Sequence, residues 1–231
     1  MADVNFQLAW DQIGERLFET GVDRGVLYVA SGASYPKGVA WNGLTGVTET
    51  GEGAEANDKY ADNIKYLSIY SAETFKGTIK AFMYPDEFCA CNGEAEPETG
   101  VVVGQQARKS FGLCYRTIIG NDTDGNDHGY KLHLVYGCHV PPTEKDYQTV
   151  NDSPDAIEFS WEFDTTPVVL NTKVDGKLLK PTSIITIDST KVDPEKLATL
   201  EAALYGTAAE GGQAAVDAYL PLPDAVIAMF Q

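Results

Sequence analysis

The feature that most constrains the fold is a long stretch at 66–138 in which apolar and polar side chains alternate along extended segments. Alternation with a period of two places the apolar side chains on one face of a β-strand. Residues 109–119 and 130–140 both show this pattern, and the Asn, Asp and Gly cluster at 120–129 is typical of a hairpin turn. The pattern predicts paired antiparallel strands and therefore a mainly β protein.

The same alternation recurs elsewhere in the chain. It is clearest at 156–163, where aromatic residues occupy one face and Glu158 and Glu162 occupy the opposite face, which must meet water. The Asp175-Gly176 pair offers the positive φ angles of a tight hairpin turn. Further strands are predicted at 22–31, 39–50, 64–72 and 75–84.

Helical signals appear near the C-terminus. Asp193 precedes Pro194, and apolar residues then recur at helical spacing, which predicts a helix with Asp193 as its N-cap. Pro223 opens a second short apolar segment that we expect to be a docking helix. The chain therefore divides into a β domain at 1–190, which begins with an N-terminal arm, and a helical C-terminal extension at 191–231.

The charge balance limits the classes of partner. The 231 residues include 34 Asp and Glu but 17 Lys and Arg, a formal net charge of −17, which argues against binding to nucleic-acid phosphates. An acidic wall would suit a conduit through which DNA passes without adhering, although acidity also simply favours solubility. The sequence lacks both a leader pattern and an apolar run of about 20 residues, so we expect a cytoplasmic origin and no membrane partner.

Residues 49–63 differ from their surroundings because they are acidic, rich in glycine and poor in large apolar side chains. They cannot contribute to a core, so we expect a solvent-facing loop or an extended hairpin. A segment of this length within a compact domain usually has a function, and a plain mobile surface loop is the alternative.

One polar cluster, at 121–128, could hold a metal ion. Asp122, Asp124 and Asp127 offer oxygen ligands, but a hairpin tip rich in turn-forming residues explains the cluster as well. The match to a calcium-binding EF-hand loop fails, because Asp127 replaces the required glycine and His133 replaces the bidentate glutamate.

Other chemical motifs give no site. The four cysteines, at positions 89, 91, 114 and 138, have neither CxxC spacing nor a disulfide framework, so we expect free thiols. The sequence has no nucleophile elbow, phosphate-binding glycine loop, HExxH helix or dinucleotide fingerprint. We therefore expect a protein that is not an enzyme and that has no cofactor.

Three stretches, at 38–63, 66–138 and 151–168, carry a resemblance to a known family. GVAWNGLTGVTETGEGAEANDKYADN, YLSIYSAETFKGTIKAFMYPDEF and NDSPDAIEFSWEFDTTPV resemble the major tail protein of long-tailed, non-contractile bacteriophages. The resemblance implies a tail-tube fold of two packed antiparallel sheets, in a sandwich or barrel, with a flanking helix. It also implies hexameric rings that stack into a tail tube in the virion, assembled in the host cytoplasm.

The same resemblance implies partners and contact residues. The partners would be further copies of the chain, a tape-measure protein, tail terminator and distal tail proteins, and DNA in transit without specific binding. The loop at 49–63 would contact the adjacent ring, and Glu158 and Glu162 are candidates for the lumen wall. The residues of the 49–63 loop that contact the adjacent ring would be Glu49, Glu52, Glu55, Asn57, Asp58 and Tyr60.

Two other functions fit the residues. A β-sandwich binding module could recognise carbohydrate or protein through the 12 tyrosines and three tryptophans. A metal-dependent hydrolase could use the cluster at 121–128. A binding module should be a monomer or a small oligomer in solution, whereas a tube protein should form rings or polymers. Metal analysis of the purified protein tests the hydrolase.

Overall fold

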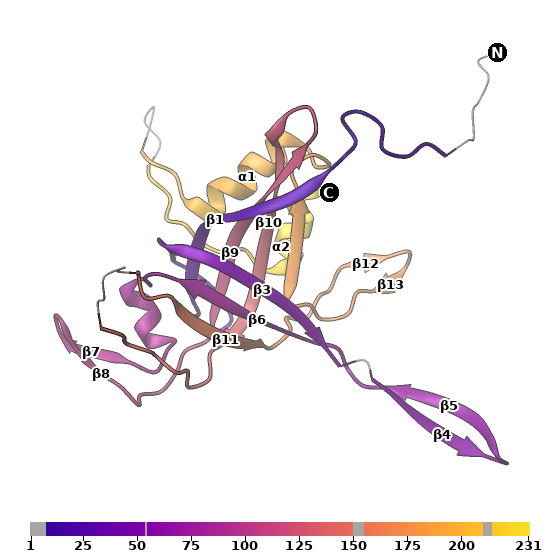
Figure 1. Ribbon diagram of the computed structural model, residues 1–231, viewed down its shortest axis with the longest axis horizontal. Coiled ribbons are helices and arrows are strands. Elements are labelled where there is room, and N and C mark those ends of the chain that lie inside the picture. The colour runs from indigo at the N-terminus through magenta and orange to yellow at the C-terminus, as the bar shows by residue number, and fades with distance from the viewer. Residues whose placement is uncertain (1–7, 54, 150–154, 210–213) are drawn as a thin grey trace.

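The computed structural model describes residues 8–53, 55–149, 155–209 and 214–231, and Figure 1 shows a mainly β molecule with two short helices. The main sheet is antiparallel and has the order β2-β1-β9-β10-β11-β6-β3, with β14 also paired to β10. Its strands are β1 (Phe18–Val29), β2 (Gly38–Ala40), β3 (Leu44–Glu52), β6 (Thr74–Ala81), β9 (Phe111–Asn121), β10 (Gly125–His139), β11 (Phe159–Thr165) and β14 (Ile184–Asp188).

The main sheet folds over itself at β10. This strand pairs with β9 and β14 along most of its length, but Cys138 and His139 pair with β11. The change of partner follows Gly137, whose φ is +63° and whose missing side chain leaves room for the carbonyl oxygen of Thr166, 2.2 Å from where a Cβ would lie. The predicted mainly β, antiparallel fold is confirmed, and its two packed layers, expected as two sheets, belong to one continuous sheet.

An aromatic core fills the space between the two layers. Trp161 and Phe163 of β11 are buried and Glu162 is exposed, as the alternation predicted. Phe88 packs against Trp41 and Trp161 with ring centroids 4.7 and 5.2 Å apart. Phe88 lies in the short 3-10 helix η1 (Asp86–Ala90), which follows Pro85.

The two helices cover the other face of the layer that contains β1, β9, β10 and β14. Helix α1 (Pro194–Tyr205) is capped by Asp193, which accepts a hydrogen bond from the backbone amide of Glu195 at 2.9 Å. Helix α2 is Pro223–Phe230. The hydroxyl of Tyr28 on β1 donates to the carbonyl of Leu204 at 2.7 Å, which ties α1 to the sheet. Both helices are therefore confirmed, and they share a core with the β domain.

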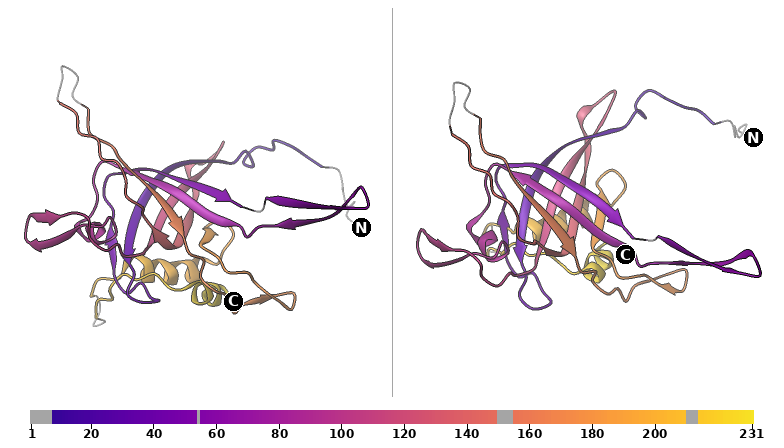
Figure 2. Two further views of the ribbon diagram at one scale, coloured as in Figure 1. Left: turned by 90° about the horizontal axis from the view of Figure 1, so that it is seen from below. Right: turned by 60° about the horizontal axis from the view of Figure 1, so that its bottom comes forward.

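Three small hairpins stand apart from the main sheet. They are β4 (Ala56–Ala61) with β5 (Ile64–Tyr70), β7 (Ala95–Glu98) with β8 (Val101–Val103), and β12 (Lys173–Val174) with β13 (Lys177–Leu178). The first two project from opposite ends of the long axis in all the views of Figures 1 and 2. The third turns at Asp175 and Gly176, both with positive φ, as predicted.

Two expected segments differ from the structure. The Glu, Pro and Gly residues at 94–100 predict a loop, yet part of this range forms β7 and pairs with β8. Residues 49–63 contain the end of β3 and all of β4, so the extended hairpin is correct and a single loop is wrong. The described part of the N-terminal arm, 8–17, contains neither strand nor helix, and its first residues lie outside the described ranges.

Candidate assembly surfaces

The β4–β5 hairpin exposes an unusual number of large apolar side chains. Among the described strands, β4 and β5 pair with each other and belong to no larger sheet. A lone two-stranded hairpin is marginally stable in water, and exposed apolar clusters mark surfaces that another molecule covers. Six side chains of this hairpin region are between 40% and 70% exposed: Tyr60, Ile64, Tyr66, Leu67, Ile69 and Tyr70.

Three of the predicted contact residues lie on this hairpin. Asn57, Asp58 and Tyr60 belong to β4, and Tyr60 is 70% exposed. Asp58 accepts hydrogen bonds from Lys65 at 2.8 Å and from the Ser68 hydroxyl at 2.6 Å. The Lys65 ammonium group lowers the pKa of the Asp58 carboxyl. Asp58 thus ties the two strands together, while Tyr60 is available to a partner.

The other three predicted contact residues are placed differently. Glu55 precedes β4 at the base of the hairpin, where its carbonyl accepts from the amide of Ser71 at 3.3 Å. Glu52 ends β3 and forms an exposed ion pair with Lys76 at 2.7 Å. Glu49 lies in the middle of β3, within the main sheet. The structure therefore separates the six residues into a hairpin group and a main-sheet group.

Glu49 points into the molecule, which corrects its assignment to a loop. It shares the inner face of β3 with Val47, since side chains two residues apart lie on the same side. Its carboxylate accepts a hydrogen bond from the Tyr115 hydroxyl and contacts His133 Nδ1 at 2.9 Å. The hydrogen bond with His133 is the main cause that lowers the pKa of Glu49. Its partners are thus in β9 and β10, so Glu49 connects the two layers.

This connection is part of a larger polar cluster. The rings of Tyr115 and His133 stack with centroids 4.7 Å apart, and the two residues are 2% and 9% exposed. The hydroxyl of Thr117 lies 3.0 Å from His133 Nε2, so both ring nitrogens of the imidazole have a partner. We refer to Glu49, Tyr115, Thr117 and His133 as the interlayer cluster.

Glu158 and Glu162 lie on the outer face of the layer formed by β3, β6 and β11. Glu162 is exposed, and Glu158 accepts a hydrogen bond from the Thr45 hydroxyl at 2.6 Å. Lys76 and Lys80 of β6 lie on the same face, paired with residues of β11 on one side and β3 on the other. This face therefore carries both acidic and basic side chains.

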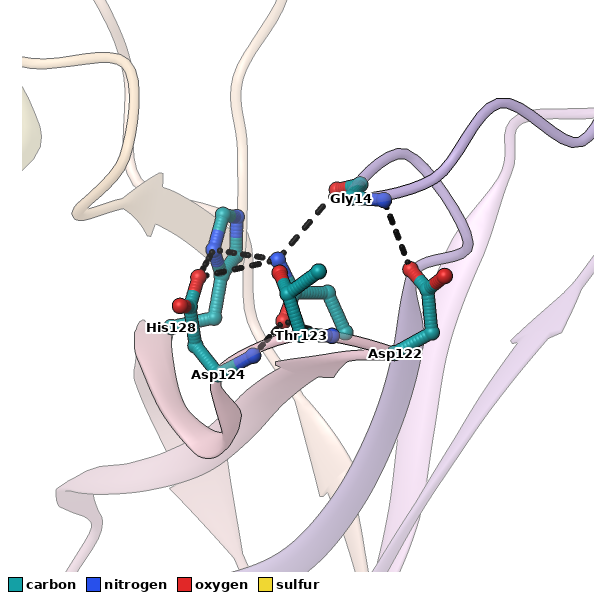
Figure 3. Close-up of polar contacts among 6 residues, drawn as sticks. Gly14, Asp122, Thr123, Asp124 and His128 are labelled. Carbon is teal, nitrogen blue, oxygen red and sulfur yellow. Dashed lines mark hydrogen bonds and ion pairs between the residues drawn. The ribbon is translucent and has the colours of Figure 1, made fainter.

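The β9–β10 hairpin tip, at 121–128, holds the N-terminal arm (Figure 3). The side-chain amide of Asn121 donates to the carbonyl of Gly14 at 3.2 Å, and the Gly14 amide donates to Asp122 at 2.9 Å. Asn121 also accepts from the amides of Thr123 and Asp124, which is typical of an Asx turn. The tip thus binds the arm through these two hydrogen bonds to Gly14.

The candidate metal ligands in this tip are not brought together as a ligand set. Asp122 contacts the arm, whereas Asp124 accepts from Asn121 at 3.0 Å and lies 3.3 Å from His128 Nδ1. Asp127 donates its backbone amide to the carbonyl of Asp124. In the part of the chain that the structure describes, no group of three or more His, Cys, Asp or Glu residues could hold a metal ion.

The cysteines are all free thiols. Cys114 and Cys138 lie in β9 and β10 and are buried, as is Cys91, while Cys89 is partly exposed. Burial raises the pKa of the Cys114 thiol to about 12, so this group is a poor nucleophile at neutral pH.

Two exposed apolar segments were not identified from the sequence. The three valines of β8 are 45–54% exposed, and the arm exposes Leu8, Trp10 and Ile13 by 72–80%. The run of three valines after a turn is a signal for a short strand, but it does not reveal whether that strand is covered. Most of the exposed large apolar side chains that the structure describes outside the main sheet belong to the hairpins and the arm.

Comparison with known proteins gives no family. No protein-family model matches the chain, and no curated protein matches it significantly. No helix formed by the described residues is long and apolar enough to cross a membrane.

Proposed function

We propose that the chain is a structural protein that assembles with copies of itself into stacked rings, as the major tail protein of a long-tailed, non-contractile bacteriophage does. The observation that carries the proposal is the projecting β4–β5 hairpin with its six exposed apolar side chains. Such a hairpin gains stability when a neighbouring copy covers it.

The free energy gained by burying these side chains is sufficient for association. Full burial of a large apolar side chain contributes about 1.5–3 kcal/mol, and six partly exposed ones amount to about 10 kcal/mol in total. Association and side-chain ordering oppose this gain by several kcal/mol for each contact. Because six copies of one ring would make this contact with the adjacent ring at the same time, the contacts reinforce one another and favour stacked rings over isolated pairs.

The net charge of the chain supports a role as a conduit for DNA. The net charge of −17 disfavours adhesion of DNA, so DNA would pass through the tube without specific binding. We assign Glu158 and Glu162 to the lumen wall, with Lys76 and Lys80 as local counter-charges. The partners would be a tape-measure protein during assembly and tail terminator and distal tail proteins at the tube ends, in a virion tail.

Replacing the hairpin tests the proposal. We would exchange residues 56–70 for a short Gly-Ser linker, which leaves β3 and β6 intact, and compare negative-stain images and sedimentation with those of the wild type. The control replaces 173–178, the β12–β13 hairpin, with a similar linker. We expect rings or tubes from the wild type and the control, and only smaller particles with native circular dichroism from the first variant.

Two results would contradict the proposal. Tubes of normal length from the 56–70 variant would show that the hairpin has no role in assembly. A wild-type protein that remains a monomer at every concentration would favour the β-sandwich binding module, and glycan-array binding would then be the next measurement.

A further inference from the structure

Two apolar hairpins mark opposite ends of the molecule. The β4–β5 and β7–β8 hairpins project in opposite directions along the long axis in Figures 1 and 2. A two-fold contact between two antiparallel copies would cover both apolar surfaces, but it would give a closed dimer that cannot grow. If each copy instead contacts the next copy in the same head-to-tail sense, both surfaces are covered and the assembly can continue.

The β7–β8 hairpin has an acidic apolar surface. Val101, Val102 and Val103 are 54%, 51% and 45% exposed. Val101 pairs with Glu98, so the two side chains lie on the same face of the hairpin. Glu96 is exposed too and accepts a hydrogen bond from the amide of Gly100, which closes the turn.

The β4–β5 hairpin has the complementary surface. Lys59 of β4 pairs with Leu67 of β5. Asn57, two residues before Lys59, pairs with Ile69, two residues after Leu67. Lys59, Leu67 and Ile69 therefore share one face, with an ammonium group beside two exposed apolar side chains. This face complements the β7–β8 hairpin, because its apolar side chains can pack on the valines and its charge is opposite to that of the carboxylates.

Like-with-like contact is less favourable. Two β7–β8 hairpins face to face would bring Glu96 and Glu98 of both copies together in a chain that is already strongly acidic. Contact between β4–β5 and β7–β8 avoids this repulsion and buries apolar side chains from both copies.

We propose that the β7–β8 hairpin of one copy receives the β4–β5 hairpin of the next copy, which makes the stacking contact heterologous and gives the assembly a direction. This inference rests on the proposed function and names the acceptor surface for its contact hairpin. A heterologous contact that does not close on itself continues as a filament, which is the geometry that a stack of rings needs.

The test uses two variants, each blocked at one end. Leu67→Asp with Ile69→Asp blocks the donor hairpin, and Val101→Asp with Val103→Asp blocks the receiver. All four positions are exposed, so native circular dichroism and an unchanged urea midpoint are expected. If either variant misfolds, the corresponding serine substitutions take its place.

Each variant alone is expected to stop at the same small particle, either a single copy or a single ring. Mixing the two variants leaves one intact contact, between the receiver of the first and the donor of the second. Sedimentation velocity should then show particles of twice the size that grow no further. Lys59→Glu should lower the association constant of the stacking contact about tenfold, and Glu98→Lys in the partner should restore it.

The possible failures are distinguishable. If the wild type forms tubes but the mixture gives no doubled particle, the head-to-tail pairing is wrong and the proposed function stands. If the receiver-blocked variant still forms tubes, or either variant pairs with itself, the pairing is also wrong. If the wild type does not assemble, both the pairing and the proposed function are wrong.

Discussion

Replacing Glu49 with alanine is expected to destabilise the fold, because this carboxylate connects the two layers of the sheet. The substitution removes the acceptor for the Tyr115 hydroxyl and for His133 Nδ1. Tyr115 is 2% exposed and His133 is 9% exposed, so neither group has ready access to water as a replacement partner.

The magnitude follows from these contacts. A hydrogen bond to a charged group contributes about 1.5–3 kcal/mol, and a buried polar group left without a partner costs about 1–3 kcal/mol. The side chain of Glu49 is itself 35% exposed, so water will enter part of the space that it leaves. We therefore expect the free energy of unfolding to fall by about 2 kcal/mol, near the lower end of the combined range.

Urea unfolding followed by tryptophan fluorescence measures this loss. With a urea dependence of about 2–3 kcal/mol per molar, the midpoint should fall by about 0.7–1 M. Glu52→Ala is the matched control, because Glu52 lies on the same strand in an exposed ion pair and its loss should change stability by less than about 0.5 kcal/mol. Equal effects of the two substitutions would refute the structural role assigned to Glu49.

Three further predictions concern stability. The hydrogen bond with His133 lowers the folded-state pKa of Glu49 below the unfolded value, so the contribution of Glu49 to stability is complete above about pH 5 and disappears as pH falls through the folded-state pKa. The difference in urea midpoint between wild type and Glu49→Ala should shrink between pH 6 and pH 3, and a constant difference would contradict this. Gly137→Ala should cost more than about 2 kcal/mol, because φ is +63° and the new Cβ would lie 2.2 Å from a carbonyl oxygen. Gly176→Ala, also at positive φ but in open space, should cost about 1 kcal/mol in the same urea assay, and equal costs would contradict the steric argument. Asp193→Ala should lower stability by about 1 kcal/mol through loss of the N-cap of α1, visible as a lower thermal midpoint, whereas an unchanged midpoint would show that the cap contributes little.

The strands and helices that could be predicted are those whose local pattern agrees with their environment. In β11, Trp161 and Phe163 alternate with Glu162, and the inner face is buried while the outer face meets water. Asp193 and the apolar spacing after it determine the start of α1 in a similar way. Local signals and tertiary packing point to the same structure at these positions.

The remaining features depend on partners that are distant in sequence. Glu49 lies in a Gly-rich acidic stretch that is typical of a loop, and the groups that hold it inside, Tyr115 and His133, are 66 and 84 residues away. The strand β7 was missed because Ala, Glu and Pro97 favour strands poorly. The alternation in β5 predicts a strand but cannot indicate that the strand leaves the main sheet and exposes both faces.

The measurement that tests the central claim most directly is sedimentation velocity of the purified wild-type protein over a hundredfold range of concentration, with negative-stain images of the same samples. Assembly through exposed hairpins predicts that mass increases with concentration and that the images contain rings or tubes. A single species with the mass of one chain at every concentration, with no rings or tubes in the images, would contradict the account.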